Sequence, residues 1–114
     1  MNEKAQSVPR ETRMEQISRL KRLTEVELPA LAVAGRWPIR FDHCFKRICF
    51  DFAFEDVWYK HLARPAERHL DGVPLLRALQ CAEELTVQGL SLLKERNRAS
   101  LGYRGKQARR QDAI

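Results

Sequence analysis

The phenylalanines of this chain lie together in one short stretch, and that stretch constrains the fold more than any other feature. Residues 35–54 hold all five phenylalanines of the 114-residue chain, together with one tryptophan and two cysteines. Burial of such large side chains is a main driving force of folding. Four apolar positions recur at the spacings of one helix face: Phe41, Phe45, Ile48 and Phe52. The pattern predicts a helix, capped at its start by Asp42, whose aromatic side chains fill the interior.

A second helix is predicted upstream of this stretch. Thr12 and Glu15 fit the capping-box pattern, in which each side chain bonds the backbone N–H of the other residue. Apolar residues then recur at helical spacing, so we expect a helix over about 13–26. Pro29 leaves two alternatives open: the helix continues with a kink, or it stops before the proline. Gly35 suits the C-terminal cap of the helix that reaches it.

The second half of the chain predicts one more long helix. A change of phase in the apolar pattern near Ala53 predicts a bend or a short break, and Pro65 ends that element. A turn at 71–74 follows. Apolar residues then line one face to about Arg96, with Gly89 inside the helix at a cost of about 1 kcal/mol relative to alanine. Three long helices joined by short connections predict an all-α protein, a small single-domain bundle of three to four helices.

Length, hydropathy and cysteine content narrow the class of protein further. A chain of 114 residues is one domain by length. No apolar run approaches the roughly 20 residues of a membrane-spanning helix, and the N-terminus lacks an apolar signal segment. An odd number of cysteines, three, argues against a disulfide framework. We therefore expect a cytoplasmic protein with reduced thiols and no membrane partner.

Positive charge is concentrated at the C-terminal end. The chain carries a net charge of +6, and residues 94–114 alone contribute +5 of it. Such a segment attracts polyanions at long range. We expect a flexible N-terminus over 1–11, a helical domain over 12–98 and a flexible basic tail over 99–114.

This charge pattern predicts a small protein that binds nucleic acid or an acidic partner and has no catalysis, cofactor or metal of its own. The residues expected to contact phosphates are the basic ones of the C-terminal segment: Lys94, Arg96, Arg98, Arg104, Lys106, Arg109 and Arg110. A second patch is expected around the aromatic stretch: Arg36, Trp37, Arg40 and Arg47. Within that stretch Arg47 and Asp51 are four residues apart, which predicts an exposed ion pair on the helix surface.

Two other classes of function stay open. One is a small enzyme or ligand-binding protein whose site combines a thiol, imidazoles and a carboxylate: His43, Cys44 and Asp51, with His61 from elsewhere in the chain. Adjacent helix residues point about 100° apart, so His43 and Cys44 do not form a dyad by themselves. The other is a homo-oligomeric interaction module such as a homodimer. The segment 58–69, where aromatic and basic groups surround a proline, is a further candidate for binding an anion or a partner.

Overall fold

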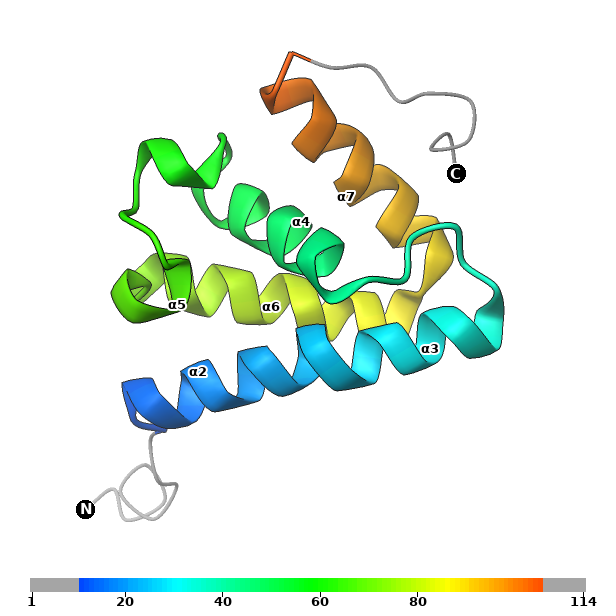
Figure 1. The fold of residues 1–114 in the computed structure, drawn as a ribbon, viewed down its shortest axis with the longest axis horizontal. Coiled ribbons are helices and arrows are strands. Elements are labelled where there is room, and N and C mark those ends of the chain that lie inside the picture. Colours follow the sequence, from blue (N-terminus) through cyan, green and yellow to red (C-terminus); the bar gives the residue numbers. More distant parts are fainter. Residues whose placement is uncertain (1–10, 106–114) are drawn as a thin grey trace, which may run out of the picture.

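The computed structural model describes residues 11–105, which consist of helices and short connections without a strand in that range. The elements follow in the order α2 (Arg13–Arg22), the π-helix η1 (Leu23–Glu27), α3 (Leu28–Gly35), α4 (Asp42–Phe54), the 3-10 helix η2 (Trp58–Lys60), α5 (Ala66–His69), α6 (Gly72–Gln88) and α7 (Leu90–Tyr103). The expected all-α class is confirmed for these residues (Figure 1). None of their helices has both the length and the apolar character that crossing a membrane requires.

The first three elements form one continuous helical rod that passes through Pro29 (Figure 1). The predicted capping box starts the rod: Thr12 Oγ1 accepts from the Glu15 N–H at 3.1 Å, and Glu15 Oε1 accepts from the Thr12 N–H at 2.8 Å. The segment Leu23–Glu27 winds as a π-helix. A proline ring crowds the carbonyl four residues before it in an α-helix. The wider turn directly before Pro29 relieves this crowding, so the helix continues to Gly35.

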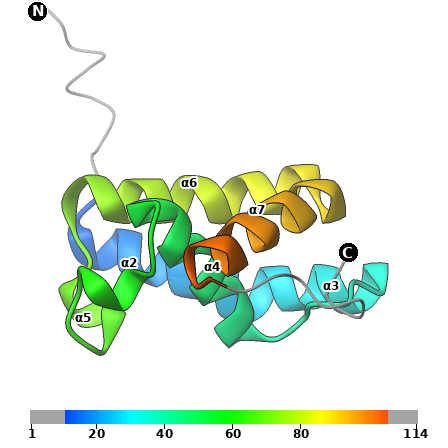
Figure 2. The ribbon, with the colours of Figure 1, turned by 90° about the horizontal axis from the view of Figure 1, so that it is seen from above.

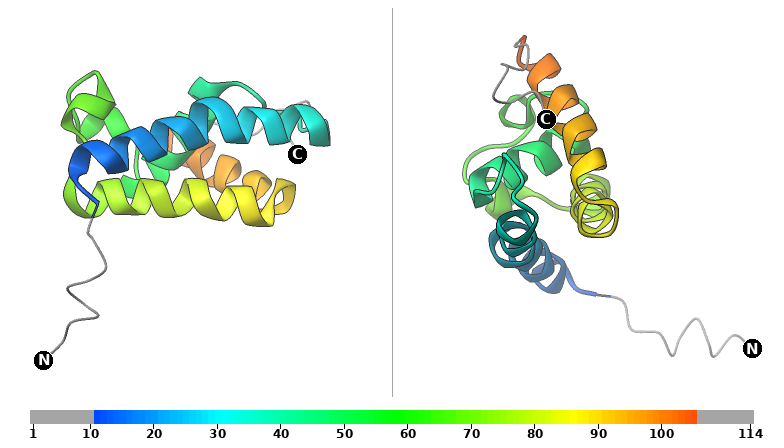
Figure 3. Two further views of the ribbon diagram at one scale, coloured as in Figure 1. Left: turned by 90° about the horizontal axis from the view of Figure 1, so that it is seen from below. Right: turned by 90° about the vertical axis from the view of Figure 1, so that its right-hand side faces the viewer.

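Helix α4 lies at the centre of the molecule, between the α2–α3 rod, α6 and α7 (Figure 3). Much of its predicted apolar face is buried: Phe45, Ile48 and Cys49 are fully enclosed, whereas Phe52 is half-buried. Phe50, which lies outside the predicted face, is 3% exposed. Phe41 differs, because it precedes the helix as its N-cap and is 60% exposed. The prediction that Phe41 belongs to the buried face is therefore wrong.

Trp37 holds the linker between α3 and α4 against the body. The indole lies so close to Gly35 that a Cβ on this glycine would come within 2.6 Å of the indole Nε1. Gly35 is the last residue of the helix, and Arg36 takes the left-handed conformation at φ 57°. Trp37 also packs edge-on against Phe45, with 6.5 Å between the ring centroids. The linker, residues 36–41, therefore follows a fixed path over the core.

The helix predicted to run on to Arg96 is divided at Gly89, where the chain changes direction. Gly89 adopts φ 71° and ψ −145°, a conformation that residues with a Cβ essentially avoid. Helix α6 therefore ends at Gln88, and α7 begins at Leu90 and turns back towards α4 (Figure 2). The prediction of one uninterrupted helix is wrong, because the positive φ of Gly89 lies outside the helical range and breaks the helix there.

Helix α7 continues to Tyr103, beyond the expected end of the helical domain at 98. Residues 99–103 of the expected tail are therefore part of the folded domain. The remaining terminal segments for which flexibility was expected, 1–10 and 106–114, lie outside the described residues.

We expect Gly89→Ala to lower the free energy of unfolding by about 1–3 kcal/mol, because a Cβ is strained in this backbone conformation. Gly102→Ala is the matched control, since Gly102 lies inside α7 and an added Cβ meets no atom within 4 Å. Alanine there should be neutral or should stabilise by up to about 1 kcal/mol. Urea unfolding followed by circular dichroism measures both variants. Equal effects would contradict the role given to Gly89.

Candidate functional site

The four residues of the predicted enzyme-like site do not converge. His43 is exposed on the first turn of α4, and Cys44 beside it is half-buried. His61 bonds a different carboxylate, through Nε2 to Asp56 Oδ2 at 3.1 Å. Asp51 is fully buried. Residues 11–105 contain no group of three side chains that would hold a metal ion.

Asp51 is instead the centre of a buried polar network between α4 and α7. Arg104 forms a bidentate ion pair with its carboxylate, from Nε to Oδ2 at 2.9 Å and from Nη2 to Oδ1 at 3.1 Å. The Ser100 hydroxyl donates to Oδ2 at 2.7 Å, and the Trp58 backbone N–H donates to Oδ1 at 3.0 Å. A buried carboxylate is tolerated when it is paired and hydrogen-bonded in this way. The network fastens the last turns of α7 to the core.

Arg47 belongs to the same network but has no carboxylate partner among the described residues. Its Nη1 donates to Ser100 Oγ at 2.8 Å, and its Nη2 donates to Asn97 Oδ1 at 2.8 Å. Burial lowers the pKa of the Arg47 guanidinium, and nearby Arg104 lowers it further. The predicted surface pair of Arg47 with Asp51 is therefore wrong, because Arg104 takes the carboxylate from a position far along the chain.

Two of the C-terminal cations predicted to contact phosphates are used within the protein. Arg104 is the partner of Asp51. Arg96 Nη2 lies 2.9 Å from Glu84 Oε1, and its guanidinium lies over the Phe52 ring at 3.9 Å from the centroid. Both side chains are mostly buried by these contacts, which reduces the positive charge that α7 presents to solvent.

Four other predicted cations are exposed and form no ion pair with any described residue: Arg36, Arg40, Lys94 and Arg98. The first two lie in the linker, and the last two lie one turn apart on α7. We call these four residues the linker–α7 patch. The remaining three predicted cations, Lys106, Arg109 and Arg110, lie outside the described residues.

The linker and α7 lie side by side. Pro38 and Ile39 of the linker share a small cavity of about 180 Å³ with Asn97 and Leu101 of α7. Helical spacing places Asn97 and Leu101 on the same side of α7 as Lys94 and Arg98.

A second candidate site is a groove of about 410 Å³ between α4 and residues 58–67. We call it the α4 groove. Nine residues line it: His43, Lys46, Arg47 and Phe50 from α4, and Trp58, Arg64, Pro65, Ala66 and Glu67 from the facing segment. Five residues of the predicted binding corner at 58–69 therefore line the groove, whereas His69 does not and is exposed.

Lys46 of the α4 groove is paired with two carboxylates. Lys46 Nζ lies 2.5 Å from Glu25 Oε2 and 2.9 Å from Glu67 Oε2. Burial opposes the charged form of this amine, but the two carboxylates outweigh it and raise the pKa of Lys46. Lys46 therefore stays charged and is already paired by two anions.

Another part of the α4 groove is aromatic and basic. Phe50 and Trp58 pack edge to face, with 5.7 Å between the ring centroids. The Arg64 guanidinium lies 5.8 Å from the Trp58 ring centroid and 4.9 Å from that of Tyr59. Arg64 forms no ion pair with a described residue, and Arg47 has none either. Both arginines line the groove, but the Arg47 guanidinium is bonded to Ser100 and Asn97 of α7, whereas Arg64 lies over the aromatic rings.

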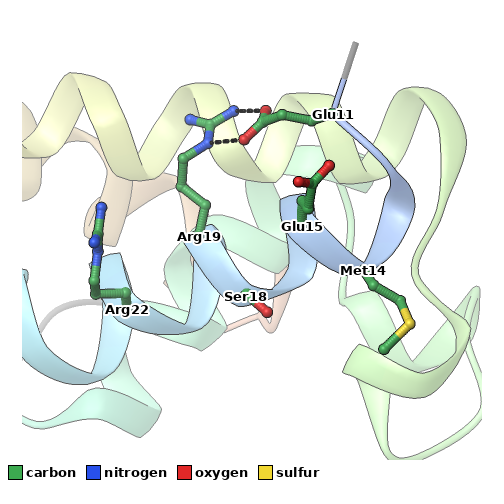
Figure 4. Close-up of a pocket in the computed structure, with 6 residues that line it drawn as sticks. All are labelled: Glu11, Met14, Glu15, Ser18, Arg19 and Arg22. Carbon is green, nitrogen blue, oxygen red and sulfur yellow. Dashed lines mark hydrogen bonds and ion pairs between the residues drawn. The ribbon is translucent and has the colours of Figure 1, made fainter. Parts of the chain in front are cut away.

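A larger depression of about 450 Å³ lies on the outer side of α2. Figure 4 shows its side chains fanning out from α2 and from Glu11, two residues before the helix, with only Arg19 and Glu11 meeting. The Arg19 Nη2 and Glu11 Oε1 atoms are 2.6 Å apart, and Arg19 also pairs with Glu83 of α6. Side chains that diverge from one helix and neutralise each other offer no converging chemistry, so this depression is not a candidate site.

Two of the three cysteines are buried in the core. Cys49 and Cys81 are completely buried where α4 meets α6. The hydrogen bond with Cys81, together with burial, raises the pKa of the Cys49 thiol well above its usual range. Because the thiolate is the nucleophilic form, Cys49 is held in its unreactive state.

Comparison with known proteins gives no further assignment. No protein-family model matches the chain, and neither a curated protein nor a solved structure shows significant similarity to it. The two candidate sites are therefore interpreted from their own chemistry.

Proposed function

We propose that this protein is a non-catalytic nucleic-acid-binding domain that contacts phosphates through the linker–α7 patch. The observation that carries the proposal is the division of the basic side chains into two groups. Arg47, Arg96 and Arg104 are bound inside the protein. The four patch cations face solvent without a carboxylate partner among the described residues. Unpaired surface cations bind polyanions by displacing the counterions of the phosphates.

Exposed aromatic rings beside the patch favour a single-stranded nucleic acid. Phe41 follows Arg40 directly and is 60% exposed, and Tyr103 in the last turn of α7 is 37% exposed. Bases of a single strand stack on such rings, and cations track its backbone. Lys106, Arg109 and Arg110 follow α7 in the sequence and add charge to the same end of the chain.

The test removes three patch cations together, as Arg40→Gln, Lys94→Gln and Arg98→Gln. The control removes the same charge at exposed positions on α2 and α5, as Lys21→Gln, Arg22→Gln and Arg68→Gln. Fluorescence anisotropy with a labelled single-stranded DNA oligonucleotide measures both variants over a range of salt concentrations. We expect the patch variant to lose at least about tenfold in affinity and the slope of log K against log salt to fall by about 2, since each phosphate contact on a single strand contributes about 0.7.

The control variant should change affinity by less than about threefold, because α2 lies on the far side of α4 and α6 from α7 (Figure 1). Equal losses of oligonucleotide affinity in the patch variant and the control variant would contradict the proposal. Tighter binding of a poly-glutamate peptide than of the oligonucleotide would assign the patch to an acidic protein partner instead.

A further inference from the structure

We propose that the cavity between the linker and α7 receives one base of the strand that the linker–α7 patch binds, and that it selects thymine or uracil. The inference rests on the function proposed above and names the base that the site recognises. The cavity has a volume of about 180 Å³. Sites for whole small molecules occupy roughly 300–1,000 Å³, so this smaller cavity suits a single ring of a larger ligand.

The cavity lies among the cations that are proposed to bind phosphates. Arg40 stands in the chain between Ile39 and Phe41, two residues that line the cavity. Arg98 directly follows Asn97, which lines the cavity from α7. Both cations are exposed and form no ion pair with a described residue. A polyanion therefore complements the charge around the cavity, and phosphates bound to these cations bring the bases of a single strand to its opening.

Much of the cavity wall is apolar, which suits a base better than a phosphate. Pro38 and Ile39 line it from the linker, and Leu101 lines it from α7. Phe41 adds an aromatic ring that is 60% exposed. This ring is supported by the His43 imidazole, on which it stacks with 5.8 Å between the ring centroids and 7° between the ring planes. A planar base gains free energy by contact with apolar and aromatic surface of this kind.

Asn97 supplies the means to select among bases. It lines the cavity and is 2% exposed. An arginine carries only hydrogen-bond donors, so the oxygen of Asn97 faces Arg47, which donates to Oδ1 from Nη2 at 2.8 Å. The Asn97 Nδ2 group forms no hydrogen bond with a described residue. Its N–H groups therefore favour a base that presents acceptors.

Thymine and uracil meet this requirement best among the bases. Their single ring carries two carbonyl oxygens, whereas adenine and cytosine each present an amino donor beside an acceptor. A donor that faces another donor leaves both unsatisfied, which costs binding free energy. Guanine presents two adjacent acceptors, but its two fused rings suit a cavity of about 180 Å³ less well than one ring does.

The experiment compares labelled oligo-dT and oligo-dA of equal length by fluorescence anisotropy with the full chain. Oligo-dT should bind at least about fivefold more tightly, the ratio that one neutral hydrogen bond typically provides. Leu101→Trp fills the cavity without changing a charge, so the ratio of the two affinities should fall below about twofold. The slope of log K against log salt should stay the same, because the phosphate contacts remain.

Leu76→Trp is the matched control, because Leu76 is 52% exposed on α6 and lies outside the cavity. This variant should keep the preference of the unchanged protein for oligo-dT. The comparison also separates recognition of a base from the properties of the strand, since pyrimidine strands can bind more tightly through their weaker stacking and greater flexibility. A preference of that origin persists when the cavity is filled, whereas recognition of a base is lost.

Phe41→Ala provides a second variant, and its fold should be intact because the ring is exposed. It removes an aromatic ring from the cavity and should weaken oligo-dT binding by at least about fivefold, the effect of losing one stacked base. Circular dichroism checks the fold of all three variants.

A preference for oligo-dT that survives in Leu101→Trp would overturn the inference. So would equal affinity of the unchanged protein for the two oligonucleotides, or undiminished oligo-dT affinity in Phe41→Ala. These results leave the proposed function standing, because the oligonucleotides still bind. Failure of both oligonucleotides to bind at low salt would overturn the proposed function itself, and the inference with it.

Discussion

Asp51→Asn is expected to lower the free energy of unfolding by about 3–5 kcal/mol, the usual cost of removing one partner from a buried ion pair. Asparagine has nearly the same shape as aspartate, so the change removes charge while preserving volume. Arg104 would lose its bidentate partner although only 17% of its side chain is exposed. Ser100 and the Trp58 N–H would lose a charged acceptor as well. Urea unfolding followed by circular dichroism measures the loss.

Asp42→Asn supplies the control for this experiment. Asp42 lies on the same helix, and its side chain is 54% exposed. We expect its replacement to cost less than about 1 kcal/mol, mainly through the helix dipole. Adding Arg104→Met to Asp51→Asn should cost less than the two single changes summed, because the two residues interact. Two results would show that the network does not fasten α7. One is that the free-energy losses of Asp51→Asn and Arg104→Met simply add in the double variant. The other is that Asp51→Asn lowers the free energy of unfolding no more than Asp42→Asn does.

Phe45→Ala is expected to destabilise the protein by about 3–5 kcal/mol, the range for deleting a buried aromatic ring. Phe45 is completely buried at the centre of α4. Its ring also packs against Trp37, so the cavity would loosen the linker that carries Arg36 and Arg40. Thermal unfolding detects the loss, and Trp37 fluorescence reports the change of its surroundings.

Phe41→Ala is the matched control, because the same sequence pattern includes both rings. Phe41 is 60% exposed, and we expect a change within about 0.5 kcal/mol, as for surface substitutions. A large loss in Phe41→Ala together with a small loss in Phe45→Ala would reverse the assignment of core and surface on this helix.

Local sequence signals predicted a large part of the fold correctly. The capping box of Thr12 and Glu15 involves residues three positions apart, so its geometry follows from the sequence alone. The spacing of Phe45, Ile48 and Phe52 predicted α4 for the same reason, since residues at this spacing share one helix face. Both signals depend on neighbours along the chain.

The features that sequence reasoning missed depend on residues far apart in the chain. Arg104 lies in a basic run that is typical of a solvated tail, and nothing near it indicates that it reaches Asp51. The spacing of Arg47 and Asp51 predicted an ion pair between them, but Arg104 pairs with Asp51 instead. The α4 groove was found only in part, since the aromatic and basic residues around Pro65 were noticed but their contact with α4 was not. Gly89 was recognised as a weak point, but not as the place where the helix breaks.

The salt dependence of single-stranded oligonucleotide binding by the full chain tests the central claim most directly. The cations counted as phosphate contacts are the four of the linker–α7 patch and the three predicted ones beyond the described residues: Arg36, Arg40, Lys94, Arg98, Lys106, Arg109 and Arg110. If all of them contact phosphates, log K should fall linearly with log salt with a slope of about −5. A slope near zero, or no binding at low salt, would contradict the account of this protein as a nucleic-acid-binding domain.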